Sequence, residues 1–250
     1  MKPETPWYEE FFDENYLRAY RPRLALVDAE KEVEFLIGQL RLQPGMRLLD
    51  LCCGQGRHAV PLARRGLRVT GLDLSGRLLA EAEKSAREAG VSVELVRRDM
   101  RDIPWSGEFD GAINMFTAFG YFDDDEQNFR VLEGMARALK PGGRFCLDVM
   151  SYSWLLRHYE EKGWSCGEGD LLELEERRMD WATGYHESET TFIEPDGSRK
   201  KRTIRVRMFA PHELVSWLHR AGLTVESLFG DLAGSPFGLD TPRLVLVGRK

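Results

Sequence analysis

A glycine-bearing turn near residue 50 carries the most distinctive chemistry of the chain. Residues 46–51 form an apolar run of strand length, and Gly54 and Gly56 then lead into a helical stretch that starts at Arg57. A helix N-terminus behind such a turn presents free backbone N–H groups and a positive dipole end, and it lets a ligand approach the backbone closely. The segment, with Asp50 before its turn, predicts a binding site for a polar or anionic group.

Two further acids follow the next two apolar runs. Asp73 stands 23 residues after Asp50, and Asp99, followed by Met100, ends the third run. A carboxylate at the end of the second strand can accept two hydrogen bonds from a ribose diol. Ligands of open α/β sheets bind outside the carboxyl ends of the strands. Three acids at successive strand ends therefore predict a nucleoside-type ligand.

These residues need a parallel sheet to bring them together, and the surrounding pattern predicts one. Strand-like and helical stretches alternate from residue 46 to residue 150, which is typical of βαβ units. The expected strands are 46–51, 67–72, 91–96, 109–115 and 144–150, with helices at 57–65, 77–89 and from 123 to Pro141. Residues 7–42 read as helix. Near the other end of the chain, a further helix opens at Pro211, and two strands follow it at 223–229 and 243–247.

The pattern changes after residue 160. Three strand-like stretches, 171–181, 185–193 and 201–209, are joined by short turns and predict an antiparallel meander. The expected fold is α/β: a doubly wound, mostly parallel, Rossmann-like seven-stranded sheet with an inserted antiparallel β meander. We expect 1–160 and 211–250 to form the main domain, with an N-terminal helical cap (1–42), and 161–210 to cover one side of its site.

Composition and charge limit the class of protein. The chain has 250 residues, a net charge of −6 and a pI of about 5.5. Proteins that bind polyanions usually carry a basic surplus, so nucleic acid is an unlikely partner. The absence of an apolar run near the roughly 20 residues of a membrane span, and of a secretory signal at the start, predicts a cytoplasmic protein with no membrane partner. Adjacent Cys52 and Cys53 do not form a CxxC pair, so we expect no metal site, only reduced, buried cysteines.

Sequence motifs exclude some nucleoside-containing ligands and favour another. The chain lacks GxGxxG and GxxxxGK[ST], the signatures of dinucleotide and P-loop sites. The ordered set LLDLCCGQGRH, GLDLS, RRDM, FDGAINMF and LKPGGRF resembles the class I S-adenosylmethionine-dependent methyltransferases, of the small-molecule type. The resemblance covers 46–150 motif by motif, and the last helix and two strands resemble the closing hairpin of the family. It departs at Cys52, where the family usually has glycine.

The resemblance implies S-adenosyl-L-methionine as cofactor and S-adenosyl-L-homocysteine as product. The turn would hold the aminocarboxypropyl end, Asp73 the ribose, Leu74 one face of adenine, and Asp99 the adenine amino group with the backbone of Met100 alongside. Asn114 would lie near the sulfonium. The cofactor-binding candidates are therefore Asp50, Cys52, Gly54, Gly56, Asp73, Leu74, Asp99, Met100 and Asn114.

The acceptor site is less defined. Methyl transfer from a sulfonium is an in-line displacement that depends mainly on positioning, and a base is needed only if the acceptor must first lose a proton. The sequence contains no recognisable triad, and His58 is interpreted as a helix-start residue. The aromatic run 116–122 and an N-terminal group supply candidates for the pocket, although plain packing could explain both. They are Tyr8, Tyr20, Arg21, Phe119 and Tyr121.

The identity of the acceptor remains open. Asn114-Met115-Phe116-Thr117 is not the [NDS]PP[YF] motif of amino-group methylation on adenine or glutamine, and no cysteine follows proline. The favoured function is methyl transfer to N, O or C of a small molecule. The basic run 199–207 is the basis for an alternative function, that of an RNA (tRNA) methyltransferase or a non-catalytic methyltransferase-like binding protein. We expect instead that this run is paired with the strand carrying Glu173, Glu175 and Glu176.

Overall fold

The computed structural model describes residues 5–25 and 29–250, and a seven-stranded sheet, sheet A, lies at its centre. The strand order in sheet A is β10-β11-β5-β4-β1-β2-β3. The strands are β1 (Arg47–Leu51), β2 (Arg68–Asp73), β3 (Glu94–Arg97), β4 (Phe109–Asn114), β5 (Leu139–Met150), β10 (Thr224–Phe229) and β11 (Arg243–Arg249). Strands β1 to β5 run parallel to one another, and β11 runs antiparallel to both β5 and β10. The doubly wound, mostly parallel fold is confirmed.

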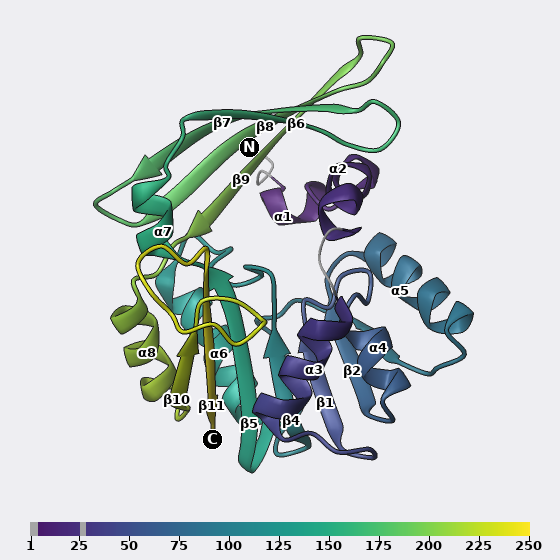
Figure 1. Ribbon diagram of the computed structural model, residues 1–250, viewed down its shortest axis with the longest axis vertical. Helices are drawn as coiled ribbons and strands as arrows, with labels where there is room; N and C mark the ends of the chain where they lie inside the picture. The colour runs from purple at the N-terminus through teal and green to yellow at the C-terminus, as the bar shows by residue number, and fades with distance from the viewer. Residues whose placement is uncertain (1–4, 26–28) are drawn as a thin grey trace.

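Helices cover both faces of sheet A (Figure 1). One face packs against α3 (Ala29–Leu40) and α4 (Ala59–Arg64), and α5 (Gly76–Glu88) lies beside α4. The other face packs against α6 (Asp125–Ala138) and α8 (Pro211–Arg220). Apolar side chains at helical spacing bury these faces, as Leu78, Leu79, Ala82 and Ala86 do in α5. Two apolar layers therefore hold the sheet rigid and leave its carboxyl edge free for a site.

A second sheet, sheet B, lies beyond the carboxyl ends of the strands of sheet A (Figure 1). It is antiparallel, in the order β6-β7-β8-β9, with β6 (Lys162–Cys166), β7 (Leu172–Asp180), β8 (Tyr185–Ile193) and β9 (Arg199–Arg207). The last three strands lie where the sequence pattern predicts them, but β6 and the short helix α7 (Tyr152–Arg157) before it were not predicted. Strand β6 has only five residues and contains Gly163, so its pattern is too short to stand out.

The N-terminal region differs from the expected single helix over 7–42. It forms α1 (Trp7–Glu10) and α2 (Glu14–Ala25) before α3. The break lies at Asp13, whose carboxylate Oδ1 accepts hydrogen bonds from the backbone N–H groups of Asn15 at 2.9 Å and Tyr16 at 3.3 Å. Such capping starts a new helix. Helices α1 and α2 lie between sheet B and the carboxyl edge of sheet A (Figure 1).

Strand β5 starts earlier than expected. Helix α6 ends at Ala138, and Leu139 already has an extended backbone and pairs with Phe109. The residue before a proline disfavours the helical region, so Pro141 holds Lys140 extended and the helix stops ahead of both. Elsewhere, no helix among the described residues is long and apolar enough to cross a membrane.

Candidate functional site

An open cavity of about 690 Å³ lies at the carboxyl edge of sheet A. Its wall is formed by the turn after β1, the ends of β2 and β3, the loop after β4, and the helices α1 and α2. The structure brings eight of the predicted site residues together on this wall: Tyr8, Cys52, Gly54, Asp73, Leu74, Asp99, Met100 and Tyr121.

A second hollow adjoins the first and shares Tyr16, Cys52 and Phe116 with it. Asp50 lies here, together with Arg57 and His58, which sequence analysis did not assign to the site. His58 is buried and its imidazole Nε2 lies 2.7 Å from Glu32 Oε2. Burial lowers the pKa of His58, and its side chain is committed to Glu32. His58 is therefore a structural residue at the start of α4, as its position suggested.

The glycine turn has the backbone that its sequence predicts. Gly54 and Gly56 have positive φ angles, of 55° and 80°. A Cβ on Gly56 would lie 3.1 Å from the Cβ of Ala82, so glycine also permits the close approach of α5. Cys52 adopts φ 58° without being glycine, and its thiol Sγ lies 3.4 Å from the sulfur of Met100. Cys52 is the position where the sequence departs from the family pattern, and it holds a left-handed backbone that glycine would adopt without strain.

Asp73 joins this turn to the second strand. Its Oδ2 accepts a hydrogen bond from the N–H of Gly54, and its Oδ1 accepts one from the N–H of Ser75, each at 2.8 Å. Burial raises the pKa of Asp73, while these backbone donors oppose the shift. Two oxygens with one donor each retain lone pairs, so the carboxylate can still accept hydrogen bonds from a ligand.

Two buried oxygens beside the turn have no partner in the protein, Asp50 Oδ2 and Asn114 Oδ1. Burial, followed by the charge of Asp73, raises the pKa of Asp50 to about 8. Asn114 uses its Nδ2 to donate to the carbonyl of Leu51 at 3.2 Å. Because buried polar atoms are normally satisfied, these two acceptors indicate a place for hydrogen-bond donors of a ligand.

Asp99 is already engaged by a neighbour. Arg101 donates to Asp99 Oδ1 through Nε at 3.0 Å and to Oδ2 through Nη2 at 2.6 Å. Burial raises the pKa of Asp99, but the hydrogen bonds of Arg101 outweigh it and hold the pKa below its usual range. Asp99 is therefore an anion at neutral pH, and a ligand must share it with Arg101.

The chain is similar to known methyltransferases in sequence and in structure. A family model described as a methyltransferase domain matches residues 48–143, from β1 into β5. The glycine/sarcosine N-methyltransferase of Halorhodospira halochloris is 25% identical over 89% of this chain and 82% of the relative. The crystal structure of an S-adenosylmethionine-dependent methyltransferase from Clostridium acetobutylicum ATCC 824 has a TM-score of 0.79 at 20% identity, covering 92% of this chain and 95% of that one.

A further solved structure shares the fold. An amino pentose methyltransferase from Micromonospora echinaspora, with S-adenosylmethionine bound, has a TM-score of 0.67 at 22% identity and covers 92% of this chain and 94% of its own. The family match falls on the segment that carries the glycine turn and the three acids. Residues 48–143 therefore belong to the methyltransferase-domain family, which supports the expected S-adenosylmethionine-dependent methyltransferase.

Aromatic rings from two directions line the cavity of this methyltransferase. Tyr8, Phe12 and Tyr16 come from the N-terminal helices and their junction, and Phe116 and Tyr121 come from the loop after β4. The rings of Phe12 and Tyr121 stack with centroids 6.1 Å apart, so the two groups meet. Together they form an apolar part of the cavity wall.

The structure places the other acceptor-pocket candidates outside this wall. Tyr20 packs on Tyr16 with centroids 4.4 Å apart, and burial raises its pKa to about 12. Phe119 is buried in the core against Phe209, and Arg21 pairs with Glu168 at the surface. Gly56 and Asn114 are likewise not part of the cavity lining.

The loop after β4 is strained in this methyltransferase. Phe116 and Thr117 both have φ near 60°, which is rare for residues other than glycine. Asp148, a buried acid within β5, accepts a hydrogen bond from the N–H of Phe116 at 2.9 Å and an ion pair from Arg243 at 2.8 Å. Sequence analysis missed Asp148, although a lone acid in an apolar strand is a usable signal. Strain that is held in place by a buried acid is typical of functional loops.

The basic run has different partners from those expected. Strand β9 pairs with β8, so Glu173, Glu175 and Glu176 on β7 are one strand too far away. Its cations contact other carboxylates instead: Asp13 for Lys200 and Arg202, Glu189 for Lys201, Asp123 and Glu187 for Arg205, and Asp125 and Glu213 for Arg207. The predicted pairing with the acids of β7 is therefore wrong: Glu187 and Glu189 lie on β8, and the other partners lie outside sheet B.

The four cysteines are free and differ in how deeply they are buried. Cys53 and Cys146 are buried and Cys52 partly so, but Cys166 is exposed, contrary to expectation. Within 5–25 and 29–250, no group of three or more His, Cys, Asp and Glu side chains is placed to hold a metal ion.

Proposed function

We propose that this methyltransferase binds S-adenosyl-L-methionine in the cavity at the carboxyl edge of sheet A and transfers its methyl group to a small molecule. The observation that carries the proposal is the pair of unpartnered buried oxygens, Asp50 Oδ2 and Asn114 Oδ1, beside the glycine turn that follows β1. The cofactor offers an ammonium donor for these acceptors and a carboxylate for the turn. The residues present therefore fit the group.

Each end of the cofactor has residues of matching chemistry. Asp73, with free lone pairs, would accept from the two ribose hydroxyls, and Leu74 would cover adenine. Asp99 would accept from the adenine amino group while Arg101 keeps it ionised, with the Met100 backbone beside it. The turn formed by Asp50, Cys52, Gly54 and Gly56 would hold the aminocarboxypropyl end, with Asn114 near the sulfonium.

When bound, the cofactor supplies an electrophilic methyl group that an acceptor attacks in line. The chain then has to hold the acceptor within about 3 Å of that carbon and keep water out, which an aromatic wall does well. Tyr20, with a pKa of about 12, and His58, which is bound to Glu32, are poorly suited to remove a proton at neutral pH. An acceptor that already has a free lone pair suits this site best.

We infer that the acceptor is an amine of a small molecule. A neutral amine nitrogen can attack before it loses a proton, which leaves afterwards from the methylated product, whereas an alcohol oxygen is a weak nucleophile until a base removes its proton. The relative from Halorhodospira halochloris methylates nitrogen by its name, and the similar structure from Micromonospora echinaspora is an amino pentose methyltransferase.

We propose that the segment 161–210 covers the acceptor side, since Arg207 of β9 donates from its N–H to the carbonyl of Gly120 at 2.7 Å.

Calorimetry with S-adenosyl-L-homocysteine tests the cofactor, and binding in the micromolar range is expected. A screen of small amines, alcohols and phenols, read by release of S-adenosyl-L-homocysteine, then tests the acceptor class. Turnover with alcohols but not amines would contradict the amine proposal. Absence of any binding heat or thermal shift would contradict the cofactor proposal itself.

The RNA alternative gains little support because the cations of β9 have carboxylate partners. Salt-dependent retention on tRNA at about 50 mM salt would favour it, since phosphate contacts are strongly salt-dependent. We expect no retention.

A further inference from the structure

The basic strand β9 contacts the N-terminal helices, and this contact has a consequence for the cavity. We define the cap as residues 7–25, which comprise α1 and α2. We propose that Asp13 is a positioning residue that latches the cap onto sheet B, so that the ion pairs of β9 set how long the cofactor stays in the cavity. The proposal rests on the proposed function for the identity of the ligand.

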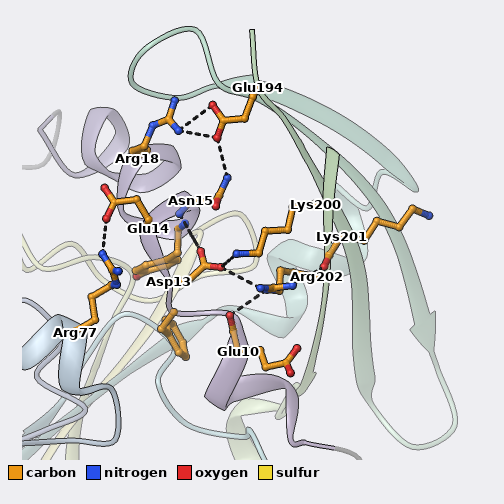
Figure 2. Close-up of polar contacts among 12 residues, drawn as sticks. Glu10, Asp13, Glu14, Asn15, Arg18, Arg77, Glu194, Lys200, Lys201 and Arg202 are labelled. Atoms are coloured by element: carbon orange, nitrogen blue, oxygen red, sulfur yellow. Dashed lines mark hydrogen bonds and ion pairs between the residues drawn. The ribbon is translucent and has the colours of Figure 1, made fainter. Parts of the chain in front are cut away.

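Asp13 performs two tasks with its two oxygens. Its Oδ1 accepts the N–H groups of Asn15 and Tyr16 and so starts α2. Its Oδ2 accepts Lys200 Nζ at 2.5 Å and Arg202 Nη2 at 3.2 Å, both from β9 (Figure 2). One carboxylate thus couples the first turn of a cap helix to sheet B.

Further bonds surround this latch (Figure 2). Arg202 Nε donates to the carbonyl of Glu10 at 3.0 Å, and Arg18 pairs with Glu194 of the β8–β9 turn at 2.7 Å. On the opposite side, Glu14 pairs with Arg77 of α5 at 2.5 Å. The cap is therefore attached to sheet B on one side and to the main domain on the other.

The latch lies next to the residues that close the cavity. Phe12 directly precedes Asp13, Tyr16 follows three positions later, and both line the cavity together with Tyr8. The rings of Phe12 and Tyr16 contact each other across Asp13, with centroids 5.0 Å apart. A shift of Asp13 away from β9 would therefore move two walls of the cavity at once.

The closed arrangement is held by a small margin. Asp13 and Arg202 are about one-fifth exposed and Lys200 is 43% exposed, and partly exposed ion pairs contribute only modestly. Trp7 Nε1 of the cap and Glu173 Oε1 of sheet B are also buried without partners in this arrangement, which costs free energy. A cap that is attached by such pairs can open to exchange ligand and close again.

Hydrogen exchange of the protein without cofactor tests the latch independently of the ligand. Asn accepts hydrogen bonds at a helix N-terminus as well as Asp does, so Asp13→Asn removes the charge and leaves the hydrogen bonds that start α2 in place. We expect amides of residues 7–20 to exchange about fivefold faster in Asp13→Asn, the effect of losing a modest ion pair. Asp13→Ser should behave alike, and Asp240→Asn, which breaks the ion pair with Arg157 outside the cap, should change nothing in this segment.

Stopped-flow dissociation of S-adenosyl-L-homocysteine gives the second readout. The rate should rise about fivefold in Asp13→Asn and in Lys200→Met, and less than multiplicatively in the double variant because the two residues share one interaction. Added salt should speed dissociation more in the wild type than in Asp13→Asn, where pairs such as Arg18–Glu194 and Glu14–Arg77 remain to be screened. Unchanged exchange and unchanged dissociation in Asp13→Asn would overturn the latch. Failure of the wild type to bind S-adenosyl-L-homocysteine would overturn the proposed function, while the exchange experiment would still decide the latch.

Discussion

The backbone N–H of Gly54 donates a hydrogen bond to Asp73 Oδ2 over 2.8 Å. This bond joins the turn after β1 to the end of β2, so two halves of the cavity wall are fixed relative to each other by one buried carboxylate. Loss of the carboxylate would therefore affect both the shape of the turn and the acceptor offered to a ribose.

Substitution of Asp73 should weaken the cofactor site strongly. Hydrogen bonds to a charged group contribute about 1.5–3 kcal/mol, so Asp73→Asn should reduce the affinity for S-adenosyl-L-homocysteine by one to two decades. Calorimetry measures this loss directly. Asp102→Asn is a suitable control because Asp102 is an exposed acid that pairs with Arg130 and does not line the cavity. A loss of less than threefold for Asp73→Asn would contradict the role of Asp73.

Ligand binding should release a proton from Asp50. With a pKa of about 8, raised by burial and by the charge of Asp73, this carboxyl is mostly protonated at pH 7, although Arg57 opposes the shift. An ammonium group placed beside Asp50 Oδ2 favours the ionised form. We expect up to about one proton to be released at pH 7 and fewer at pH 9, measured by calorimetry in buffers of different ionisation enthalpy. Asp50→Asn should remove the release, and persistence of the release in this variant would show another source.

The same group should make the stability of the ligand-free protein depend on pH. Its pKa is higher in the folded protein than the usual value near 4, so the folded state holds the proton more tightly. The contribution of Asp50 is therefore fully present below pH 4 and is lost as the pH rises to about 8. Urea unfolding of the wild type and of Asp50→Asn should differ in slope across this range. Parallel pH profiles would contradict the raised pKa.

Cys52 offers a test of the turn backbone. At φ 58°, a β-branched residue is strongly disfavoured, whereas glycine is not. We expect Cys52→Val to lower the free energy of unfolding by about 2 kcal/mol and Cys52→Gly to change it by less than about 1 kcal/mol. S-adenosyl-L-homocysteine should bind to Cys52→Gly within threefold of wild type. Tight binding by a well-folded Cys52→Val would show that this backbone is not required.

Gly120 tests the join between the strained loop and sheet B. It has φ 97°, and a Cβ there would lie 2.5 Å from the carbonyl oxygen of Arg207. Gly120→Ala should therefore lower the free energy of unfolding by about 2–3 kcal/mol, measured in urea. Gly142→Ala is a useful comparison, because that glycine also has positive φ but has open space around its Cα. Similar losses in both variants would mean that only the backbone angle matters.

Local patterns in the sequence were sufficient for the fold and for the acids of the site. Asp73 follows an apolar run in a βαβ unit, and the topology then determines which edge it occupies. Interactions between distant segments could not be predicted in this way. Asp13 contacts Lys200 across 187 positions, and nothing near either residue indicates the other. For the same reason the basic run was assigned the wrong partners, and Phe119 was expected in the acceptor pocket although it packs in the core.

Sheet B is made from one uninterrupted stretch of chain, from Lys162 to Arg207, inserted between β5 and α8. A different segment could be grafted at the same two joins without changing the strand order of sheet A. Such a chimera would have to keep an N–H that reaches the carbonyl of Gly120 and cations that reach Asp13. If both contacts are kept, the acceptor preference could change in evolution or by engineering without a change in the residues that are proposed to bind the cofactor.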